Sequence, residues 1–455
     1  MAELIVGIDV GTTAVKVAAF TVDGTLVHTH SVPYPISRPK PGWAEQDPLD
    51  WWRGTQAGLA ALPQGEIRSI GIVSQVNTHV FVDAAVKPLA PAIIWQDQRC
   101  ASIAATFDAQ FSAEDKTRIW GAPIVLDASF LPARAQWLAS TAPSLWDATR
   151  WVLSPKDFIA AQLTGRVATD LLSSVRIAGP SGYIPEAVAL VDGLSDRLPP
   201  MLPPEQVGTM DAFGSVLGTG LPWSGRRGMV LCGTSLVVAG ASTSGAAPGI
   251  VTFPPYDGVL VHAGPTQAAG DAVRWWSQVS GLDIPAVFEF AASGSSGVVF
   301  TPYLAGERAP LWDSSVRATF LGLQSSTSQA DMSRAVLEGV AMSGRHVLEV
   351  VEQACGFTVE SLTFSGGGAR SPLWAQIFAD VLGRPVERLR VHDSGTLGAA
   401  LLGAVGAGVY PSVAEAAAAT VSVDSVFSPT KSMDTLYSVY RDTYEALRDI
   451  HARLV

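Results

Sequence analysis

Two apolar runs joined by a glycine–threonine turn begin the chain, and this pattern limits the fold more than any other feature. The runs are Leu4 to Val10 and Val15 to Thr21, with Gly11-Thr12-Thr13 between them. Such runs around a short turn are typical of a β-hairpin. A similar pattern, Met229 to Gly240 around Gly233-Thr234-Ser235, recurs in the second half of the chain. The repetition predicts two similar domains, each with one such hairpin.

The length of the chain also favours two domains, because 455 residues exceed what one hydrophobic core usually serves. The stretch GTGLPWSGRRG has the glycine, proline and serine density of a connector. We therefore place an N-terminal domain at residues 1–224 and a C-terminal domain at 225–455. In the second domain, apolar spacing predicts a long helix over Gln329 to Ala354, and Leu362 to Gly383 predicts a strand, a glycine turn and a helix. The expected fold class is α/β.

Composition indicates a compact protein that binds a small ligand. Hydrophobic residues make up 48% of the chain and charged residues 16%, which excludes a disordered chain. The net charge of −11 argues against nucleic acid or an anionic membrane as a partner. The longest uncharged stretch, Gly228 to Tyr256, is rich in Gly, Ser, Thr and Pro, so we expect buried strands there and no transmembrane segment.

Cysteine use favours a reducing compartment. The three cysteines, Cys100, Cys232 and Cys355, are odd in number and far apart. Neither a disulfide framework nor a metal-ligand spacing is visible in that arrangement. The first ten residues resemble a strand and lack the features of a signal peptide. We therefore expect a cytoplasmic location.

A glycine–threonine hairpin can hold phosphate, because its backbone N–H groups can converge on an anion without a Cβ in the way. Asp9, at the end of the first run, could then hold the Mg²⁺ that accompanies a nucleotide. The turn SGGGAR, which precedes a predicted helix, could lie against a flat adenosine. Each pattern taken singly also fits a plain structural role, as an ordinary hairpin or a tight strand-to-helix turn.

Eight segments taken in order resemble the FGGY carbohydrate kinases, the sugar-kinase branch of the actin-like ATPases, over nearly the whole chain. They are GIDVGTTAVK, GWAEQDPLDWW, IIWQDQR, SPKDFIAAQLTG, GTSLVV, TPYLAGERAPLWD, SGGGARSPLWAQIFADVLGRPV and GTLGAALLGA. The resemblance implies two ribonuclease-H-like domains, with ATP and a sugar in the cleft between them. It implies transfer of the γ-phosphoryl group to a sugar or polyol hydroxyl, with ATP and Mg²⁺ as cofactors, and it leaves room for a homodimer.

The nucleotide-binding residues that the resemblance implies fall into four groups: a first phosphate loop, a second phosphate loop, a further nucleotide contact and an adenosine-side turn. In that order they are Asp9, Gly11, Thr12, Thr13 and Lys16; Gly233, Thr234 and Ser235; Gly270 and Arg274; and Gly366, Gly367, Gly368, Ala369 and Ser371. Asp9 is the carboxylate implied for Mg²⁺.

On the sugar side, the segment SQVNTHVFVD matches the strand whose end reaches the substrate in the family, at Gln75, Val76, Asn77 and Thr78. Xylulose kinases typically carry Gln-Met-His here and glycerol kinases Arg-Glu. The lack of an arginine counts against glycerol, and Asn77 offers hydroxyls a different donor and acceptor pattern from histidine. A xylulose-like ketopentose is the expected substrate. Further pocket candidates, which also fit structural roles, are Trp43, Glu45, Trp95, Asp97 and Arg99.

The family's catalytic aspartate has no evident counterpart where we expect it. It belongs to a Gly-Asp-Asn/Gln-Ala-Ala segment, expected between Pro222 and Gly233, and the ten residues between them contain no acid. About 20 residues, a strand and a helix, are then missing. Loss of the proton acceptor predicts an impaired kinase, slower by a factor on the order of 10²–10⁴. Asp170 and Asp97 are candidate substitutes, although each also fits a structural role.

Three other interpretations remain open. The chain could be an inactive protein that binds nucleotide or sugar, or its coding sequence could have lost a segment. An actin-like ATPase without a sugar substrate would keep the hairpins but would not need GWAEQDPLDWW or IIWQDQR, so these two segments favour the sugar kinase.

Overall fold

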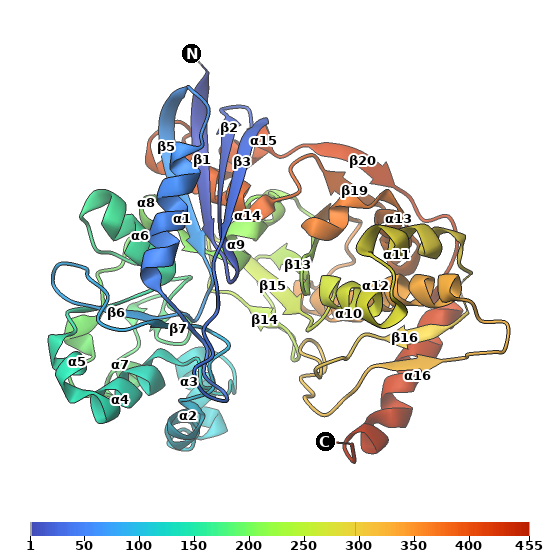
Figure 1. Ribbon diagram of the computed structural model, residues 1–455, viewed down its shortest axis with the longest axis horizontal. Helices are drawn as coiled ribbons and strands as arrows, with labels where there is room; N and C mark the ends of the chain where they lie inside the picture. Colours follow the sequence, from blue (N-terminus) through green and yellow to red (C-terminus); the bar gives the residue numbers. More distant parts are fainter. Residues whose placement is uncertain (1, 296, 455) are drawn as a thin grey trace. The chain divides into compact units, whose positions relative to one another are not determined.

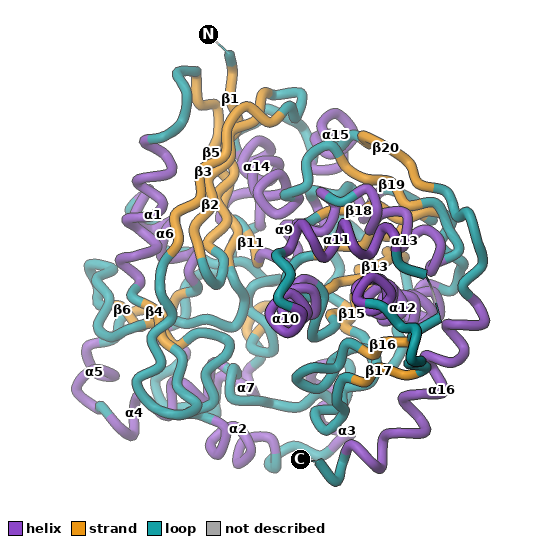
Figure 2. The backbone as a smooth tube through the Cα atoms, turned by 45° about the vertical axis from the view of Figure 1, so that its right-hand side comes forward, coloured by secondary structure: helices purple, strands orange, loops and turns teal. Residues whose placement is uncertain are grey.

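The computed structural model describes residues 2–295 and 297–454, which form two compact units (Figure 1). One unit comprises Met1–Gly218 with Gly395–Thr420, and the other Thr219–Ser394 with Val421–Val455. Each unit contains a mixed β-sheet with helices packed against it (Figure 2).

The main sheet of the first unit has five strands in the order β11-β5-β1-β2-β3. Their bounds are β1 Glu3–Val10, β2 Ala14–Thr21, β3 Leu26–Pro33, β5 Glu66–Ser74 and β11 Thr209–Met210. Strands β1 and β2 form the expected antiparallel hairpin, in which Asp9 lies opposite Lys16. Strand β5 runs parallel to both β1 and β11. The three parallel strands therefore end at the same edge of the sheet.

Helices cover both faces of this sheet. Helix α1 (Pro48–Ala60) packs on Val15 and Val17 of β2 through its glycines, and the Asp47 carboxylate caps its first turn. Helix α14 (Ser394–Gly406) covers the opposite face at very short range. A Cβ on Gly7 would lie 1.8 Å from the Thr396 oxygen, so only glycine permits this approach. The segment with α14 thus lies in sequence between the two parts of the second unit but packs on the first.

The rest of the first unit, which contains a second hydrophobic core, consists of short strands and helices. Its elements are β4 Glu45–Gln46, β6 Val80–Val82, β7 Ala92–Ile93, α2 Ala101–Asp108, α3 Ala113–Trp120, α4 Leu131–Thr141, α5 Pro143–Ala148, β8 Trp151–Leu153, α6 Pro155–Thr164, β9 Ala178–Gly179, β10 Gly182–Tyr183, α7 Pro185–Val188, η1 Ser195–Arg197, α8 Pro204–Val207, α9 Asp211–Leu217 and α15 Val413–Thr420.

The main sheet of the second unit has seven strands in the order β14-β15-β13-β12-β18-β19-β20. Their bounds are β12 Arg227–Cys232, β13 Leu236–Ser242, β14 Val251–Thr252, β15 Leu260–Pro265, β18 Ser361–Ser365, β19 Val386–Leu389 and β20 Val423–Phe427. Strands β12 and β13 form an antiparallel hairpin, and β18 runs parallel to β12. The order β18-β12-β13-β15 repeats β5-β1-β2-β3 of the first unit, which confirms the expected similarity of the two halves.

The long predicted helix is present as α12 (Gln329–Cys355), which begins at a capping box between Ser328 and Asp331. The predicted strand, glycine turn and helix are β18, η3 and α13. The other elements of this unit are η2 Leu221–Trp223, α10 Gly270–Ser280, α11 Ile284–Ser293, β16 Val299–Thr301, β17 Thr319–Leu321, η3 Gly367–Arg370, α13 Pro372–Leu382 and α16 Asp434–His451.

The long uncharged stretch supplies strands β12 and β13, which are mostly buried as expected, and the two-residue strand β14, in which Val251 is exposed. Among the described residues, no helix is both long enough and apolar enough to cross a membrane. Cys100, Cys232 and Cys355 are buried free thiols.

Candidate functional site

Three parallel strands of the first unit end in one row. Ser74, the last residue of β5, pairs with Val10 of β1 on one side and with Met210 of β11 on the other. The residues that follow these strand ends are Gly11, Gln75 and Asp211. Because parallel strands point the same way, the glycine–threonine turn, the expected sugar segment and an aspartate all leave one edge of the sheet.

Asp211 corrects the expectation that the strand and helix carrying an acid are missing. Both are present as β11 and α9, but they precede the Gly-Leu-Pro turn instead of following it, and Asp211 is the first residue of α9. Met210 and Ala212 replace the glycine and amide that flank the acid in the family pattern. One sequence signal could have identified Asp211. It is an acid directly before AFGSVLG, a run of small and apolar residues at the start of a helix.

The surroundings of Asp211 suit a proton acceptor. Asp211 is partly buried, and this burial raises the pKa of its carboxyl group to about 6, although the nearby Lys16 acts in the opposite direction. One carboxylate oxygen accepts the backbone N–H of Ala212 at 2.7 Å. A carboxyl group with a pKa close to neutrality can gain and lose a proton under ordinary conditions.

The first glycine–threonine turn is held from several sides. The Gln46 side chain donates to the Thr12 carbonyl at 2.6 Å, and the Trp95 indole donates to the Thr12 hydroxyl oxygen at 3.0 Å. The Tyr34 hydroxyl donates to the Gly11 carbonyl. These contacts fix the backbone of the turn, and the Thr12 hydroxyl keeps its own proton to donate.

Asp9 and Lys16 lie opposite each other next to this turn, with 3.9 Å between the carboxylate and the ammonium. The described residues contain no cluster of three His, Cys, Asp or Glu side chains that could hold a metal ion. Magnesium is commonly bound through one or two carboxylates together with substrate phosphates. Asp9 therefore fits a Mg²⁺ ion that arrives with a nucleotide and not a resident, protein-only metal site.

The expected sugar segment is connected to the turn by side chains. Gln75 is buried and donates from Nε2 to Gln46 Oε1 at 2.8 Å, and Gln46 in turn holds Thr12. The other amide atom, Gln75 Oε1, is buried without a hydrogen bond from the residues that the structure describes. Gln75 is thus oriented with an acceptor left over for a ligand hydroxyl.

Asn77 occupies a turn that its neighbours stabilise. Its φ of 51° is a left-handed conformation that asparagine tolerates. The fully buried Arg134 donates to the Asn77 carbonyl at 2.6 Å and to the Ile93 carbonyl at 2.9 Å. All four residues of the expected sugar segment, 75–78, line one cavity of about 30 Å³, which is large enough to admit a hydroxyl-sized group.

Three of the remaining sugar-side candidates, Trp43, Glu45 and Asp97, form a closed cluster around Arg99. Its guanidinium contacts the Asp97 carboxylate at 2.7 Å and the Glu45 carboxylate at 2.8 Å, and it lies 3.6 Å from the centre of the Trp43 ring. Asp97 is 1% exposed and also accepts the Ala44 N–H at 2.6 Å. Protein groups already occupy this buried carboxylate, so it is not available to accept a proton from a substrate. Trp95, in contrast, is 40% exposed and lies beside Thr12.

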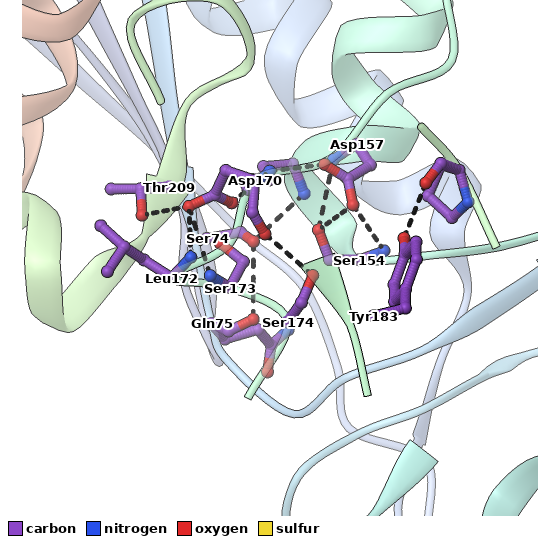
Figure 3. A network of polar contacts seen from close by, with 12 residues as sticks. Ser74, Gln75, Ser154, Asp157, Asp170, Leu172, Ser173, Ser174, Tyr183 and Thr209 are labelled. Carbon is purple, nitrogen blue, oxygen red and sulfur yellow. Dashed lines mark hydrogen bonds and ion pairs between the residues drawn. The ribbon is translucent and has the colours of Figure 1, made fainter. Parts of the chain in front are cut away.

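The carboxylate of Asp170 is likewise held by contacts with neighbouring protein groups (Figure 3). It lies 2.9 Å from the Lys156 ammonium, accepts the Thr209 hydroxyl at 2.8 Å and accepts the Leu172 N–H at 3.1 Å. Asp157 is the second carboxylate on Lys156, at 2.5 Å, and all three charged side chains are buried. Through Thr209 this network supports strand β11, two residues before Asp211.

The second unit brings its expected residues to the matching edge of its own sheet. Strands β12 and β18 are parallel, so the Gly233–Ser235 turn and the triple-glycine turn follow neighbouring strand ends. A Cβ on Gly366 would lie 2.6 Å from the Cys232 oxygen, and one on Gly368 would lie 2.5 Å from Cys232 Sγ. Both glycines are required by this close packing. Ser371 caps helix α13.

Gly270 completes this edge, because its N–H donates to the Gly233 carbonyl at 3.0 Å at the start of α10. The Thr234 carbonyl accepts from Ala269 and Asp271 at 2.9 and 3.1 Å. Arg274, one turn later, is exposed and pairs with Asp271 at 3.0 Å. The Gly233–Ser235 turn therefore packs against Gly270, and the triple-glycine turn packs against the preceding residue, Cys232.

Known proteins resemble the chain along most of its length. The sequence model of the FGGY family of carbohydrate kinases, N-terminal domain, matches residues 4–178, and that of the C-terminal domain matches 228–407. A xylulose kinase of Staphylococcus epidermidis is 28% identical over 98% of this chain and 96% of its own. A glycerol kinase of Citrifermentans bemidjiense is 29% identical over 98% of both chains. The crystal structure of a xyloylose kinase from Brucella ovis is 26% identical, covers 98% of this chain and 100% of its own, and has a TM-score of 0.86.

Proposed function

Because the chain belongs to the FGGY family of carbohydrate kinases, we propose that it transfers the γ-phosphoryl group of ATP to a hydroxyl of a xylulose-like ketopentose, with Asp211 as the proton acceptor. Family membership makes the protein a sugar kinase of the expected class, α/β with two domains of the actin-like ATPase type. One observation carries the assignment of the site: the ends of β1, β5 and β11 form one row, from which Gly11, Gln75 and Asp211 follow.

The ketopentose is supported by two facts. A xylulose kinase matches the chain nearly end to end, and Val76-Asn77 lacks the arginine expected of a glycerol site. The glycerol kinase relative has the same level of identity, so identity alone does not select the sugar. The orphan acceptor on Gln75 and the amide of Asn77 favour a neutral sugar that presents hydroxyl donors.

In the proposed reaction the sugar hydroxyl attacks the terminal phosphorus, the new O–P bond forms as the bond to ADP breaks, and the hydroxyl proton passes to the Asp211 carboxylate. A positioned base contributes a factor on the order of 10²–10⁴ to such a step. The raised pKa of Asp211 suits this role, because the carboxylate is then a better acceptor than an ordinary aspartate.

The remaining residues position the phosphates. We assign the first phosphate loop to Gly11–Thr13 with Lys16, and the second to Gly233–Ser235, since phosphoryl transfer depends chiefly on positioning and electrostatics. Asp9 would hold the Mg²⁺ ion, which neutralises charge on the phosphates. Lys16 pairs with Asp9, and its charge also acts to lower the pKa of Asp211. It therefore connects the proposed Mg²⁺ position with the proposed base.

The expected impairment no longer has a basis, because it depended on the absence of an acid that the structure contains at Asp211. We propose an ordinary kinase instead. Two alternatives, an inactive binding protein and an ATPase without a sugar substrate, can be distinguished from a kinase by measuring turnover. The cytoplasmic location and the homodimer stay predictions.

The test measures ADP release with a panel of pentoses, hexonates and polyols, for the wild type, Asp211→Asn and a control, Asp192→Asn, at an exposed position of the same unit. We expect sugar-dependent turnover of about 1–100 per second with a ketopentose. Asp211→Asn should lower kcat by a factor on the order of 10²–10⁴, with unchanged Mg-ATP affinity. Turnover with no sugar would indicate an ATPase, and binding without turnover would indicate an inactive protein. Undiminished turnover in Asp211→Asn would exclude Asp211 as the base.

A further inference from the structure

The Gly-Glu-Arg part of the segment TPYLAGERAPLWD has no role in the site described so far, yet it contains a deeply buried acid. Glu307 is 5% exposed. Its Oε1 atom accepts two backbone N–H groups, that of Gln267 at 2.6 Å and that of Arg308 at 2.7 Å. A buried carboxylate is costly unless hydrogen bonds compensate it, and these two backbone N–H groups compensate the Oε1 atom.

The two residues after Glu307 hold the same neighbouring segment. The Arg308 guanidinium donates to the Thr266 carbonyl at 2.5 Å, and the Ala309 N–H donates to the Pro265 carbonyl at 3.0 Å. Three consecutive residues thus fix three consecutive residues at the end of strand β15. This clamp acts mainly on backbone atoms, so it sets the path of the chain that follows.

That chain, residues 266–271, runs directly along the second phosphate loop. Thr266 exchanges backbone and hydroxyl hydrogen bonds with Leu236, the residue after the loop, at 2.8 and 3.3 Å. The N–H groups of residues 269–271 donate to the carbonyls of Gly233 and Thr234. A Cβ on Gly270 would lie 2.8 Å from the Gly233 oxygen, so the two segments are in tight contact.

We infer that Glu307 is a positioning residue for the nucleotide, which holds residues 266–271 against the Gly233–Ser235 loop and so keeps that loop in its binding conformation. The inference rests on the proposed phosphate-binding function of the loop. A purely structural role for Glu307 would stabilise the unit without a selective effect on nucleotide affinity. The two roles therefore differ in what a substitution does to binding.

The protonation state of Glu307 supplies a second readout. Burial raises its pKa to about 7. The groups that face it are Arg308 beside it, Ser343 of α12, and the tyrosines Tyr303 and Tyr440, the latter from α16. As pH rises through about 7, the carboxyl becomes a charged acceptor, and charged acceptors form stronger hydrogen bonds than neutral ones. Loop positioning should therefore improve with pH, and a glutamine should resemble the protonated form.

The experiment uses calorimetry of Mg-ADP binding and of sugar binding on the full chain. Glu307→Ala should raise the nucleotide Kd about tenfold or more, with the sugar Kd unchanged within about twofold. Glu307→Gln keeps a carbonyl acceptor, so the ratio of its nucleotide Kd to that of the wild type should be near one at pH 6 and higher at pH 8. Taking a ratio cancels the titration of the nucleotide itself.

The control is Asp380→Asn. This buried acid of helix α13 in the same unit accepts the Thr430 N–H at 2.7 Å but does not hold the loop. Its nucleotide Kd should equal that of the wild type. Equal nucleotide affinity of Glu307→Ala and the wild type overturns the inference, as does a pH-independent ratio for Glu307→Gln if the alanine variant does not fold. A matching loss in Asp380→Asn also overturns it, whereas a wild type that binds no nucleotide overturns the proposed function as well.

Discussion

Met210 lies directly opposite Ser74 in the parallel pairing of β11 with β5. The consequence is that Asp211 and Gln75, the next residues along the two strands, emerge side by side from the sheet. A base and a sugar contact are needed on adjacent strand ends if the base is to reach the hydroxyl that Gln75 helps to place. This relationship depends on β11, a strand of only two residues.

The first prediction concerns the pH dependence of the reaction. Asp211 must be ionised to accept a proton, and its pKa is raised to about 6 by burial. We therefore expect kcat, at saturating ATP and sugar, to fall as pH decreases through about 6 and to be about tenfold lower at pH 5 than at pH 8. Steady-state rates from pH 5 to 9 check this. A flat profile, or a decline centred near pH 4, would contradict the assignment.

The second prediction concerns stability at the same residue. Because the pKa of Asp211 is higher in the folded chain than the ordinary value of 3.8, the folded state favours the neutral form. The stability that this proton provides is fully present below about pH 4 and is lost as pH rises through about 6. Asp211→Asn should therefore be more stable than the wild type at pH 8, by about 1–3 kcal/mol, and similar to it at pH 4. Urea unfolding at both pH values measures the difference, and a variant less stable at pH 8 would contradict it.

The third prediction separates the side chain of Asn77 from its backbone. Asn77→Gly removes the amide and accepts the φ of 51° without strain, whereas Asn77→Ala adds a strain of about 1 kcal/mol. If the amide contacts the sugar, both variants should weaken sugar affinity by a similar factor, with unchanged nucleotide affinity. Only the alanine variant should lose stability. Calorimetry and thermal unfolding of the pair distinguish the effects, and loss in the alanine variant alone would indicate a structural asparagine.

Much of the fold could be predicted from local patterns. The two hairpins are visible because each is an uninterrupted pair of apolar runs around a Gly-Thr turn, and helix α12 is visible from its apolar spacing. Long-range packing could not be predicted in the same way. Helix α14 returns to the first unit because Gly7 and Gly71 allow its backbone to approach, and no local pattern identifies the partner of a glycine.

The candidate site shows the same division. The expected phosphate and sugar segments lie at strand ends, but Asp211 was missed because Met210 and Ala212 do not match the residues that usually flank the acid. Asp97 illustrates the opposite difficulty. The sequence shows an acid in a promising segment, whereas only the structure shows that Arg99 and the Ala44 N–H occupy it. Residue type indicates what a side chain can do, and its neighbours decide whether it is available.

The fourth prediction concerns the buried ion network of Figure 3. Lys156 is 0% exposed and is shared by Asp157 and Asp170. Lys156→Met would leave two buried carboxylates without a cation and should destabilise the fold by about 3–5 kcal/mol. Arg118→Met, which breaks an exposed pair with Glu186 at 3.1 Å, should cost no more than about 1 kcal/mol. Chemical denaturation of both variants measures the contrast, and equal losses would show that burial of the network contributes nothing.

The last prediction uses two adjacent glycines of the adenosine-side turn. A Cβ on Gly368 would lie 2.5 Å from Cys232 Sγ and 3.1 Å from the Trp374 ring, whereas one on Gly367 would have no heavy atom within 4 Å. Gly368→Ala should therefore destabilise the second unit by about 1–3 kcal/mol through overpacking. Gly367→Ala should leave stability within about 0.5 kcal/mol of the wild type.

Nucleotide affinity gives the pair its functional meaning. Gly367 is exposed and adds no internal contact, so a methyl group there can interfere only with a ligand that lies against the turn. If adenosine lies there, Gly367→Ala should raise the Kd for Mg-ADP about tenfold with an unchanged melting temperature and an unchanged sugar Kd. Calorimetry and thermal unfolding on the same preparations decide the matter. A Gly367→Ala protein that binds Mg-ADP like the wild type would place the adenosine elsewhere, because the turn would then tolerate added bulk on the face that the nucleotide is expected to touch.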